Sequence, residues 1–166
     1  MRHWRGYTVI EVMITLVLIA VATTLAVPSF RLMIDRNHLS AAANDLVSAF
    51  LTTRSEAVKR ECRISISKNV DWKAGWTAKV PTDIPTGCTA LELINHETSS
   101  RGLAIATNGG IGDEVIFWPD GRAAGLAGGG SDYFTLTLNG QTRIVCLTQN
   151  GRPYVLDGEL VGGNCP

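Results

Sequence analysis

Four cysteines carry the most reactive side chains of this chain, and their spacing limits the chemistry open to them. Cys62, Cys88, Cys146 and Cys165 lie far apart, and none belongs to a Cys-x-x-Cys pair. This spacing disfavours a zinc site and a thioredoxin-type redox motif. An even number of cysteines is compatible with two disulfides if the chain is exported to an oxidising compartment, and the sequence leaves three pairings open.

The other ionisable residues form no pattern typical of catalysis. His3, His38 and His96 are scattered, with no cysteine or carboxylate cluster beside them at ligand spacing, so we expect no metal and no other cofactor. The chain has no nucleophile elbow, no His-Glu-x-x-His helix and no paired-acid motif. We therefore expect a protein that is not an enzyme.

Glu11 is a carboxylate inside an apolar segment. Residues 12–27 contain no charge, no glycine and no proline, and the 21 residues from Tyr7 to Val27 would form a helix of about 31 Å, enough to cross a bilayer core of about 30 Å. An ionisable group there costs several kcal/mol unless it finds a partner. Glu11 therefore has either an assembly role or a location where it can reach the headgroups.

The first six residues differ from the apolar segment in charge. Arg2 and Arg5 predict that the N-terminus stays cytoplasmic while the bulk of the chain is translocated. An ordinary secretory signal is the alternative, but it would place a small-residue cleavage site after the apolar run. Here the alanines lie within a run that continues to Pro28.

The run Gly6-Tyr7-Thr8-Val9-Ile10-Glu11-Val12-Met13 resembles the class III signal of type IV pilins and type II secretion pseudopilins. The resemblance implies that a prepilin peptidase cuts between Gly6 and Tyr7 and N-methylates Tyr7. It differs from the usual pattern only in having tyrosine where phenylalanine is common. Pro28 falls at the position where helices of this family kink, and proline opposes a straight helix because it lacks an N–H group.

The same resemblance gives Glu11 an assembly role that electrostatics supports. When subunits pack into a filament, the carboxylate of one subunit can pair with the free N-terminal amine of Tyr7 on a neighbour, so that two buried charges compensate each other. Glu11 is thus expected to be an assembly residue.

After Pro28 the pattern is that of an amphipathic helix ending near Arg60. Its apolar positions are Phe30, Met33, Ile34, Leu39, Ala43, Leu46, Val47, Phe50, Leu51, Ala57 and Val58. Beyond Cys62 the sequence changes to short β-prone runs. The expected strands are 63–68, 76–80, 90–94, 103–107, 114–118, 133–138, 143–148 and 153–156. Asn139-Gly140, Asn150-Gly151 and Pro119-Asp120-Gly121 predict tight turns between strands of an antiparallel sheet.

Nearly the whole chain resembles the GspH/FimT family of minor pilins and pseudopilins. The resemblance lies in the N-terminal helix, the Cys62–Cys88 segment, Gly75-Trp76, the Phe117–Arg122 turn and the C-terminal hairpin. The resemblance implies an α+β, type IV pilin-like fold with a long helix on an antiparallel β-sheet domain. Its expected parts are a cleaved leader (1–6), a transmembrane and assembly helix (7–28), an amphipathic half-helix (29–61) and a β-rich domain (62–166). It also implies disulfides Cys62–Cys88 and Cys146–Cys165.

The function implied by the resemblance is that of a minor pilin in pilus assembly or priming. Its expected partners are other major and minor pilins, prepilin peptidase and the inner-membrane assembly platform. The expected location is the bacterial inner membrane, with the β-rich domain in the periplasm, and then the pilus at the cell surface. A type II secretion pseudopilin is an alternative that shares the same leader and fold.

DNA is a further candidate partner, since some FimT-like minor pilins bind DNA through a Gly-Arg-x-Arg motif. The corresponding segment here is Gly151-Arg152-Pro153-Tyr154, with tyrosine in place of the second arginine. Arg122 and Arg143 would add cationic charge if they lie close, and Tyr154 could stack on a base of single-stranded DNA. The carboxylates Asp157 and Glu159 oppose this. The net charge of zero gives no independent support.

Overall fold

The computed structural model describes residues 6–81, 88–89, 91–97, 102–130, 132–158 and 160–166. The chain divides into an N-terminal unit, residues 1–36, and a β-rich unit, residues 37–166. Helix α1 (Val9–Arg60) contributes its first part to the N-terminal unit and its second part to the β-rich unit.

Helix α1 ends in a hydrogen-bonded cap immediately before the first disulfide. Glu61 adopts a left-handed conformation with φ of 54°. The Cys62 N–H donates to the Ala57 carbonyl (3.2 Å) and the Glu61 N–H donates to the Val58 carbonyl (3.3 Å). This is the pattern of a Schellman cap, in which orphan carbonyls of the last turn are satisfied. The cap turns the chain from α1 into the first strand, β1 (Ile64–Lys68).

The second part of α1 packs on the sheets through one face. The buried residues are Leu39, Ala42, Ala43, Leu46, Ala49, Phe50, Thr53 and Ala57. Four alanines on this face let the helix backbone approach the sheets closely. Leu51 and Val58, which belonged to the expected apolar stripe, are instead exposed. Thr53 can be buried on this face because its hydroxyl donates to the Ala49 carbonyl (2.7 Å). The polar group of Thr53 is thereby satisfied within the helix.

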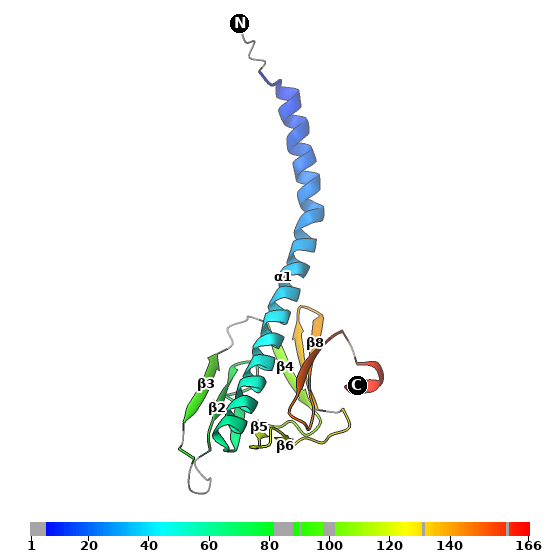
Figure 1. Ribbon diagram of the computed structural model, residues 1–166. Coiled ribbons are helices and arrows are strands. Elements are labelled where there is room, and N and C mark those ends of the chain that lie inside the picture. The colour runs from blue at the N-terminus through cyan, green and yellow to red at the C-terminus, as the bar shows by residue number, and fades with distance from the viewer. Residues whose placement is uncertain (1–5, 82–87, 90, 98–101, 131, 159) are drawn as a thin grey trace. The chain divides into compact units, whose positions relative to one another are not determined.

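The strands form two antiparallel sheets (Figure 1). The five-stranded sheet has the order β3 (Glu92–Glu97), β2 (Gly75–Lys79), β1 (Ile64–Lys68), β5 (Glu114–Phe117) and β6 (Ala123–Ala124). The four-stranded sheet has the order β4 (Ala104–Asn108), β7 (Tyr133–Leu138), β8 (Gln141–Leu147) and β9 (Pro153–Asp157). A short 3-10 helix, η1 (Val161–Gly163), lies near the C-terminus. Strand β4 precedes β5 in the chain but belongs to the other sheet.

All eight expected strands are present, with differences in their bounds. Residues 133–138 form β7 as predicted, whereas the run expected at 90–94 forms β3 at Glu92–Glu97 and residue 90 lies outside the described residues. The two-residue strand β6 was not predicted, because it is too short to show an alternating pattern. The strands form two sheets, whereas one antiparallel sheet was expected. A strand pattern in the sequence does not determine which strands pair.

The expected turns connect these strands. Asn139 and Gly140, with φ of 48° and 78°, form the two-residue link between β7 and β8. The turns at Pro119-Asp120-Gly121 and Asn150-Gly151 are longer, and each contains a glycine with a left-handed backbone near its end. In one, the Gly121 N–H donates to the Trp118 carbonyl (2.8 Å). In the other, the Gly151 N–H donates to the Thr148 carbonyl (2.8 Å).

Phe50 joins the two sheets in the core of the β-rich unit. Its ring centroid lies 6.2 Å from that of Phe117 on β5 and 5.4 Å from that of Phe134 on β7. Trp72 then meets Phe134 edge-on at 4.9 Å. All four side chains are buried. One helix residue therefore contacts an aromatic ring from each sheet, and aromatic pairs of this kind add about 0.5–1.5 kcal/mol beyond their buried area.

Candidate functional site

The residues around the expected cleavage position are accessible in the N-terminal unit. Gly6 is exposed, and the side chain of Tyr7 is 84% exposed. Helix α1 begins two residues later, at Val9. The Gly6–Tyr7 bond therefore lies outside the helix and is exposed.

Glu11 occupies the third position of α1, where it takes part in a helix cap. Thr8 precedes the helix, and its hydroxyl oxygen accepts a hydrogen bond from the Glu11 N–H (3.3 Å). Thr-x-x-Glu is the sequence pattern of a capping box, which the sequence analysis did not consider. A carboxylate in the first turn also interacts favourably with the helix dipole. The hydrogen bond that is present uses the Glu11 backbone, so the carboxylate itself makes no hydrogen bond or ion pair within the described residues.

The apolar part of α1 has the properties of a membrane-spanning segment. By length and composition α1 can cross a membrane, and its most apolar window is entirely unburied within the structure. Its threonines satisfy their own hydroxyl groups: Thr15, Thr23 and Thr24 donate to the carbonyls of Val12 (2.8 Å), Ala20 (2.9 Å) and Val21 (2.7 Å). No threonine in this set needs water as an acceptor, which suits a hydrocarbon environment.

Pro28 lies inside α1, so it does not end the helix. Because proline has no N–H group, the carbonyl four residues earlier receives no helical hydrogen bond from it. A bend of the helix at Pro28 stays a prediction.

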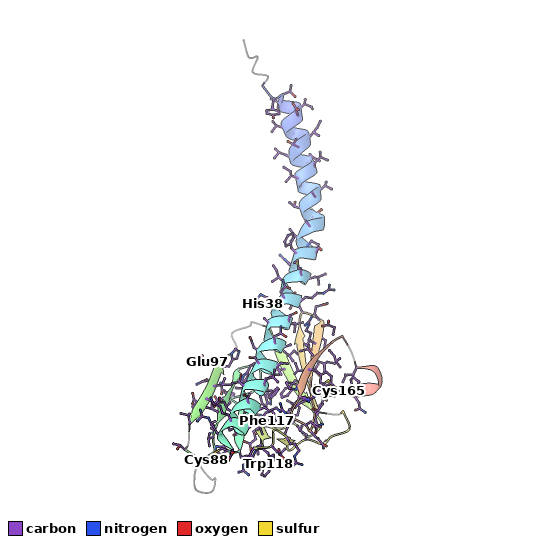
Figure 2. All side chains as sticks on the ribbon, viewed as in Figure 1. His38, Cys88, Glu97, Phe117, Trp118 and Cys165 are labelled. Carbon is purple, nitrogen blue, oxygen red and sulfur yellow. A yellow bond between two sulfur atoms is a disulfide. The ribbon has the colours of Figure 1, made fainter. Side chains whose placement is uncertain are left out.

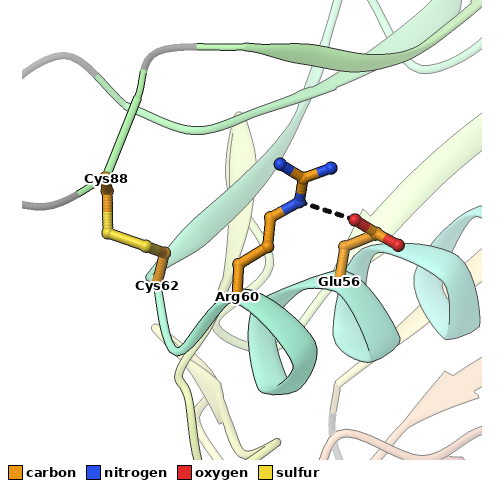
Figure 3. Close-up of a disulfide and its surroundings, with 4 residues drawn as sticks. All are labelled: Glu56, Arg60, Cys62 and Cys88. Carbon is orange, nitrogen blue, oxygen red and sulfur yellow. Dashed lines mark hydrogen bonds and ion pairs between the residues drawn. A yellow bond between two sulfur atoms is a disulfide. The ribbon is translucent and has the colours of Figure 1, made fainter.

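Two disulfides are present in the β-rich unit. Cys62 is bonded to Cys88 and Cys146 to Cys165, the same pairs that the resemblance implies. The first ties the end of α1 to the segment before β3, beside the Arg60–Glu56 ion pair (Figure 3). The hydrogen bond from Arg60 is the main cause of a lowered pKa of Glu56. The second ties the C-terminal segment to β8.

The Phe117–Arg122 turn and the Gly151-Arg152 turn lie side by side. Arg54 on α1 donates through Nε to the Gly121 carbonyl (2.9 Å), and the Ala123 N–H donates to the Gln149 carbonyl (3.0 Å). A Cβ atom added to Gly151 would come within 2.2 Å of the Gly121 carbonyl oxygen. We call this contact among Arg54 and the two turns the turn junction. It connects the two sheets outside the aromatic core.

The turn junction brings two of the predicted DNA-binding residues into neighbouring turns. Arg152 follows Gly151, and Arg122 follows Gly121; both side chains are exposed. Arg122 forms an ion pair with Asp120 (Nε to Oδ2, 2.6 Å). The pKa of Asp120 is lowered, first by the hydrogen bond from the Arg122 backbone N–H and then by the one from its side chain. Arg122 is therefore partly neutralised, whereas Arg152 makes no hydrogen bond or ion pair through its side chain within the described residues.

Arg143 lies at the far end of the β8–β9 ladder, whereas Tyr154 lies on β9 near the Gly151 turn. Arg143 pairs with Asp157 (Nη2 to Oδ1, 2.8 Å) at the opposite end of the β8–β9 ladder. Leu147 lies four positions after Arg143 along β8, which is about 13 Å at roughly 3.3 Å per residue. The Tyr154 hydroxyl donates to the Pro166 carbonyl (2.7 Å), and burial raises the pKa of Tyr154. Glu159 lies outside the described residues.

Trp118 is a candidate surface residue that the sequence analysis did not single out. It begins the turn that carries Arg122, its side chain is 44% exposed, and it lies at the periphery of the β-rich unit (Figure 2). The guanidinium carbon of Arg63 lies 5.8 Å from its ring centroid, a cation–π distance. Tryptophan inside a Trp-Pro-Asp-Gly turn is the sequence signal that could have identified it, since turn residues are rarely buried.

The described residues contain no group of three or more His, Cys, Asp or Glu side chains arranged to hold a metal ion.

Two family models match the chain, one at its N-terminus and one over most of the β-rich unit. Residues 42–151 match the family model described as type II transport protein GspH, and residues 1–27 match the prokaryotic N-terminal methylation motif. No curated protein matches the chain.

The fold is shared with two crystal forms of the type IV minor pilin FimU from Pseudomonas aeruginosa. The first has a TM-score of 0.60 and 24% identity, with 81% of this chain and 99% of FimU covered. The second has a TM-score of 0.57 and 24% identity, with 77% and 100% covered. These comparisons confirm the expected α+β, type IV pilin-like fold. The family match covers well over half of the sequence, and the chain therefore belongs to the GspH family of type IV minor pilins and GspH-like pseudopilins, with an N-terminal methylation motif.

Proposed function

We propose that the chain is a minor pilin that is cut by prepilin peptidase after Gly6, methylated at Tyr7 and incorporated into a type IV pilus, where it supports assembly or priming. The observation that carries the proposal is the N-terminal methylation motif followed directly by an unburied apolar helix. A soluble protein would not leave such a helix exposed to water, because burial of apolar surface is strongly favourable.

The orientation follows from charge and from the cysteines. Arg2 and Arg5 favour a cytoplasmic N-terminus. The two disulfides in the β-rich unit are typical of an oxidising compartment. The β-rich unit would accordingly reside in the periplasm before assembly, and its partners would be other pilins, prepilin peptidase and the inner-membrane assembly platform.

A type II secretion pseudopilin is the alternative, because the matched family is described by a type II transport protein. Both roles use the same leader, helix and assembly chemistry. The neighbouring genes distinguish them: pilus-assembly genes would support the minor pilin, and secretion genes would support the pseudopilin.

Processing is tested by replacing Gly6 with valine. We expect the variant to keep its leader, because the branched side chain adds bulk at the bond that the peptidase must hold. Intact-protein mass spectrometry of the membrane fraction would show a chain that begins at Met1 and is unmethylated at Tyr7. The matched control Arg5→Lys keeps the leader charge and should be cut normally. Normal cleavage of the Gly6 variant at Tyr7 would refute the processing step.

DNA binding is a second candidate function, favoured by the turn junction. The junction places Arg152 and Arg122 in adjacent turns and Trp118 at the start of one of them. Exposed cations beside an exposed aromatic ring suit single-stranded DNA, which binds through phosphate contacts and base stacking. We do not include Arg143 in the proposed surface, because it pairs with Asp157 at the far end of the β8–β9 ladder.

For the DNA proposal we expect Arg152→Ala to weaken binding of single-stranded DNA and to lower the slope of log affinity against log salt by about one. The measurement is fluorescence anisotropy with the full chain in detergent across a salt series. Arg143→Ala is the matched control and should bind as the parent does. If the parent protein does not bind at low salt, or if both variants weaken binding equally, the proposed surface is wrong.

A further inference from the structure

A polar cleft lies beside the turn junction, between the glycine-rich loop at 128–130 and the turn after β8. Its volume of about 380 Å³ falls within the range of roughly 300–1,000 Å³ that small-molecule sites occupy. The residues lining it are Gly128, Gly129, Gly130, Asp132, Leu147, Thr148, Gln149, Asn150, Tyr154, Cys165 and Pro166. None of the residues assigned above to leader processing or filament assembly lines this polar cleft.

The loop wall of the polar cleft is fixed in place by a buried carboxylate. Asp132 is 1% exposed. Its Oδ1 accepts hydrogen bonds from the N–H groups of Gly110 (2.7 Å) and Ala127 (2.8 Å), and its Oδ2 accepts one from Gly128 (2.6 Å). The Cys165 N–H donates to the Gly130 carbonyl (2.6 Å), and Cys165 is itself bonded to Cys146 on β8. A preformed wall reduces the entropy lost when a ligand binds.

The charge of the lining limits the ligand class. Among the described lining residues there is no lysine, arginine or histidine to compensate an anion. Asp132 is the one acidic side chain among them, and three backbone N–H groups already occupy it, so it is not available to a cation. A charged ligand would lose hydration without gaining a partner, which is costly. The polar cleft therefore suits an uncharged polar ligand.

Two side-chain amides and one aromatic ring remain to recognise such a ligand. Within the described residues, the amides of Gln149 and Asn150 make no hydrogen bond, and the Gln149 amide lies against the loop at Gly128. Each amide offers both donors and an acceptor, as hydroxyl groups require. Tyr154 adds a partly buried ring whose hydroxyl is already bonded to Pro166, so its apolar face is the part left for contact.

We propose that the polar cleft binds a neutral saccharide, with Gln149 and Asn150 hydrogen-bonding its hydroxyl groups and Tyr154 packing against the C–H face of a sugar ring. This combination of amides, an aromatic face and no available charge matches the alternating polar and apolar surfaces of a sugar. The proposal goes beyond filament assembly and does not depend on it.

The test is calorimetric titration of the full chain in a detergent without a sugar headgroup. The probes are the trimer of N-acetylglucosamine, maltotriose, cellotriose and, as an anionic comparison, a thymidine dinucleotide. We expect at least one trisaccharide to bind with an affinity that added salt does not change. The double variant Gln149→Met and Asn150→Ala should weaken this binding about tenfold or more, since it removes one or two hydrogen bonds.

A matched control is Asn95→Ala, an exposed amide on β3, which should bind as the parent does. Denaturation by urea would establish that the double variant is as stable as the control. Failure of all three trisaccharides to bind would overturn the proposal, and so would equal affinity of the parent and the double variant. Displacement of a bound trisaccharide by the dinucleotide would overturn the assignment to a neutral ligand.

Discussion

Gly151→Ala is expected to lower the free energy of unfolding by about 2–5 kcal/mol. Gly151 has a φ of 70°, and its added Cβ would lie 2.2 Å from the Gly121 carbonyl oxygen and 3.2 Å from Arg54. The left-handed backbone costs a residue with a side chain about 1–2 kcal/mol, and forcing atoms into a packed contact costs roughly 1–3 kcal/mol more. Urea denaturation of the full chain in detergent, followed by tryptophan fluorescence, measures the change.

Gly140→Ala is the matched control for this prediction. Gly140 also has a left-handed backbone, with a φ of 78°, but nothing lies within 4 Å of its added Cβ. It should show the backbone cost alone. The difference between the two variants then isolates the contact between the turns. If both variants lose equal stability, the turn junction contributes nothing to the fold.

Glu11→Gln is expected to reduce incorporation of the subunit into filaments about a hundredfold or more. The reason is the proposed pairing of Glu11 with the Tyr7 amine of a neighbour, since removal of one partner from a buried pair costs about 3–5 kcal/mol and each 1.4 kcal/mol is tenfold. Glutamine removes the charge but keeps a polar side chain that is compatible with a capping box, and the backbone bond to Thr8 is unaffected. The measurement is the subunit content of sheared filaments relative to the membrane fraction, by immunoblot.

Glu11→Ala provides the comparison that separates the charge of the side chain from its hydrogen-bonding capacity. It removes both, while the backbone N–H at position 11 can still donate to Thr8, so the charge-pair role predicts that alanine and glutamine are equally deficient. Alkaline extraction should show that both variants remain in the membrane. If glutamine restores incorporation and alanine does not, Glu11 acts through an uncharged polar group and the proposed pairing with Tyr7 is wrong.

Local patterns predicted much of this fold from the sequence. The three-to-four-residue periodicity up to Arg60 predicted the soluble part of α1, and the Asn139-Gly140 pair predicted the β7–β8 link. Both features depend on neighbouring residues alone. The exposure of Leu51 and Val58 could not be predicted in the same way, because it depends on which helix face the two sheets cover.

The surface around Arg152 was predicted only in part for a related reason. The sequence identified three arginines, but their proximity is decided by tertiary contacts among Arg54, Gly121 and Gly151. These contacts place Arg122 beside the Gly151 turn, while strand register places Arg143 at the far end of the sheet. The polar cleft was also unpredicted, since its lining comes from three separate segments that the second disulfide and Asp132 hold together.

The interleaved order of the strands has a consequence for cooperativity. Strand β4 of the four-stranded sheet is inserted in the chain between β3 and β5 of the five-stranded sheet. The strands of each sheet are therefore interrupted in the chain by at least one strand of the other sheet. Because Phe50 also contacts a ring from each sheet, loss of either sheet would expose the core of the other. The β-rich unit should unfold in a single transition, with no intermediate that retains one sheet.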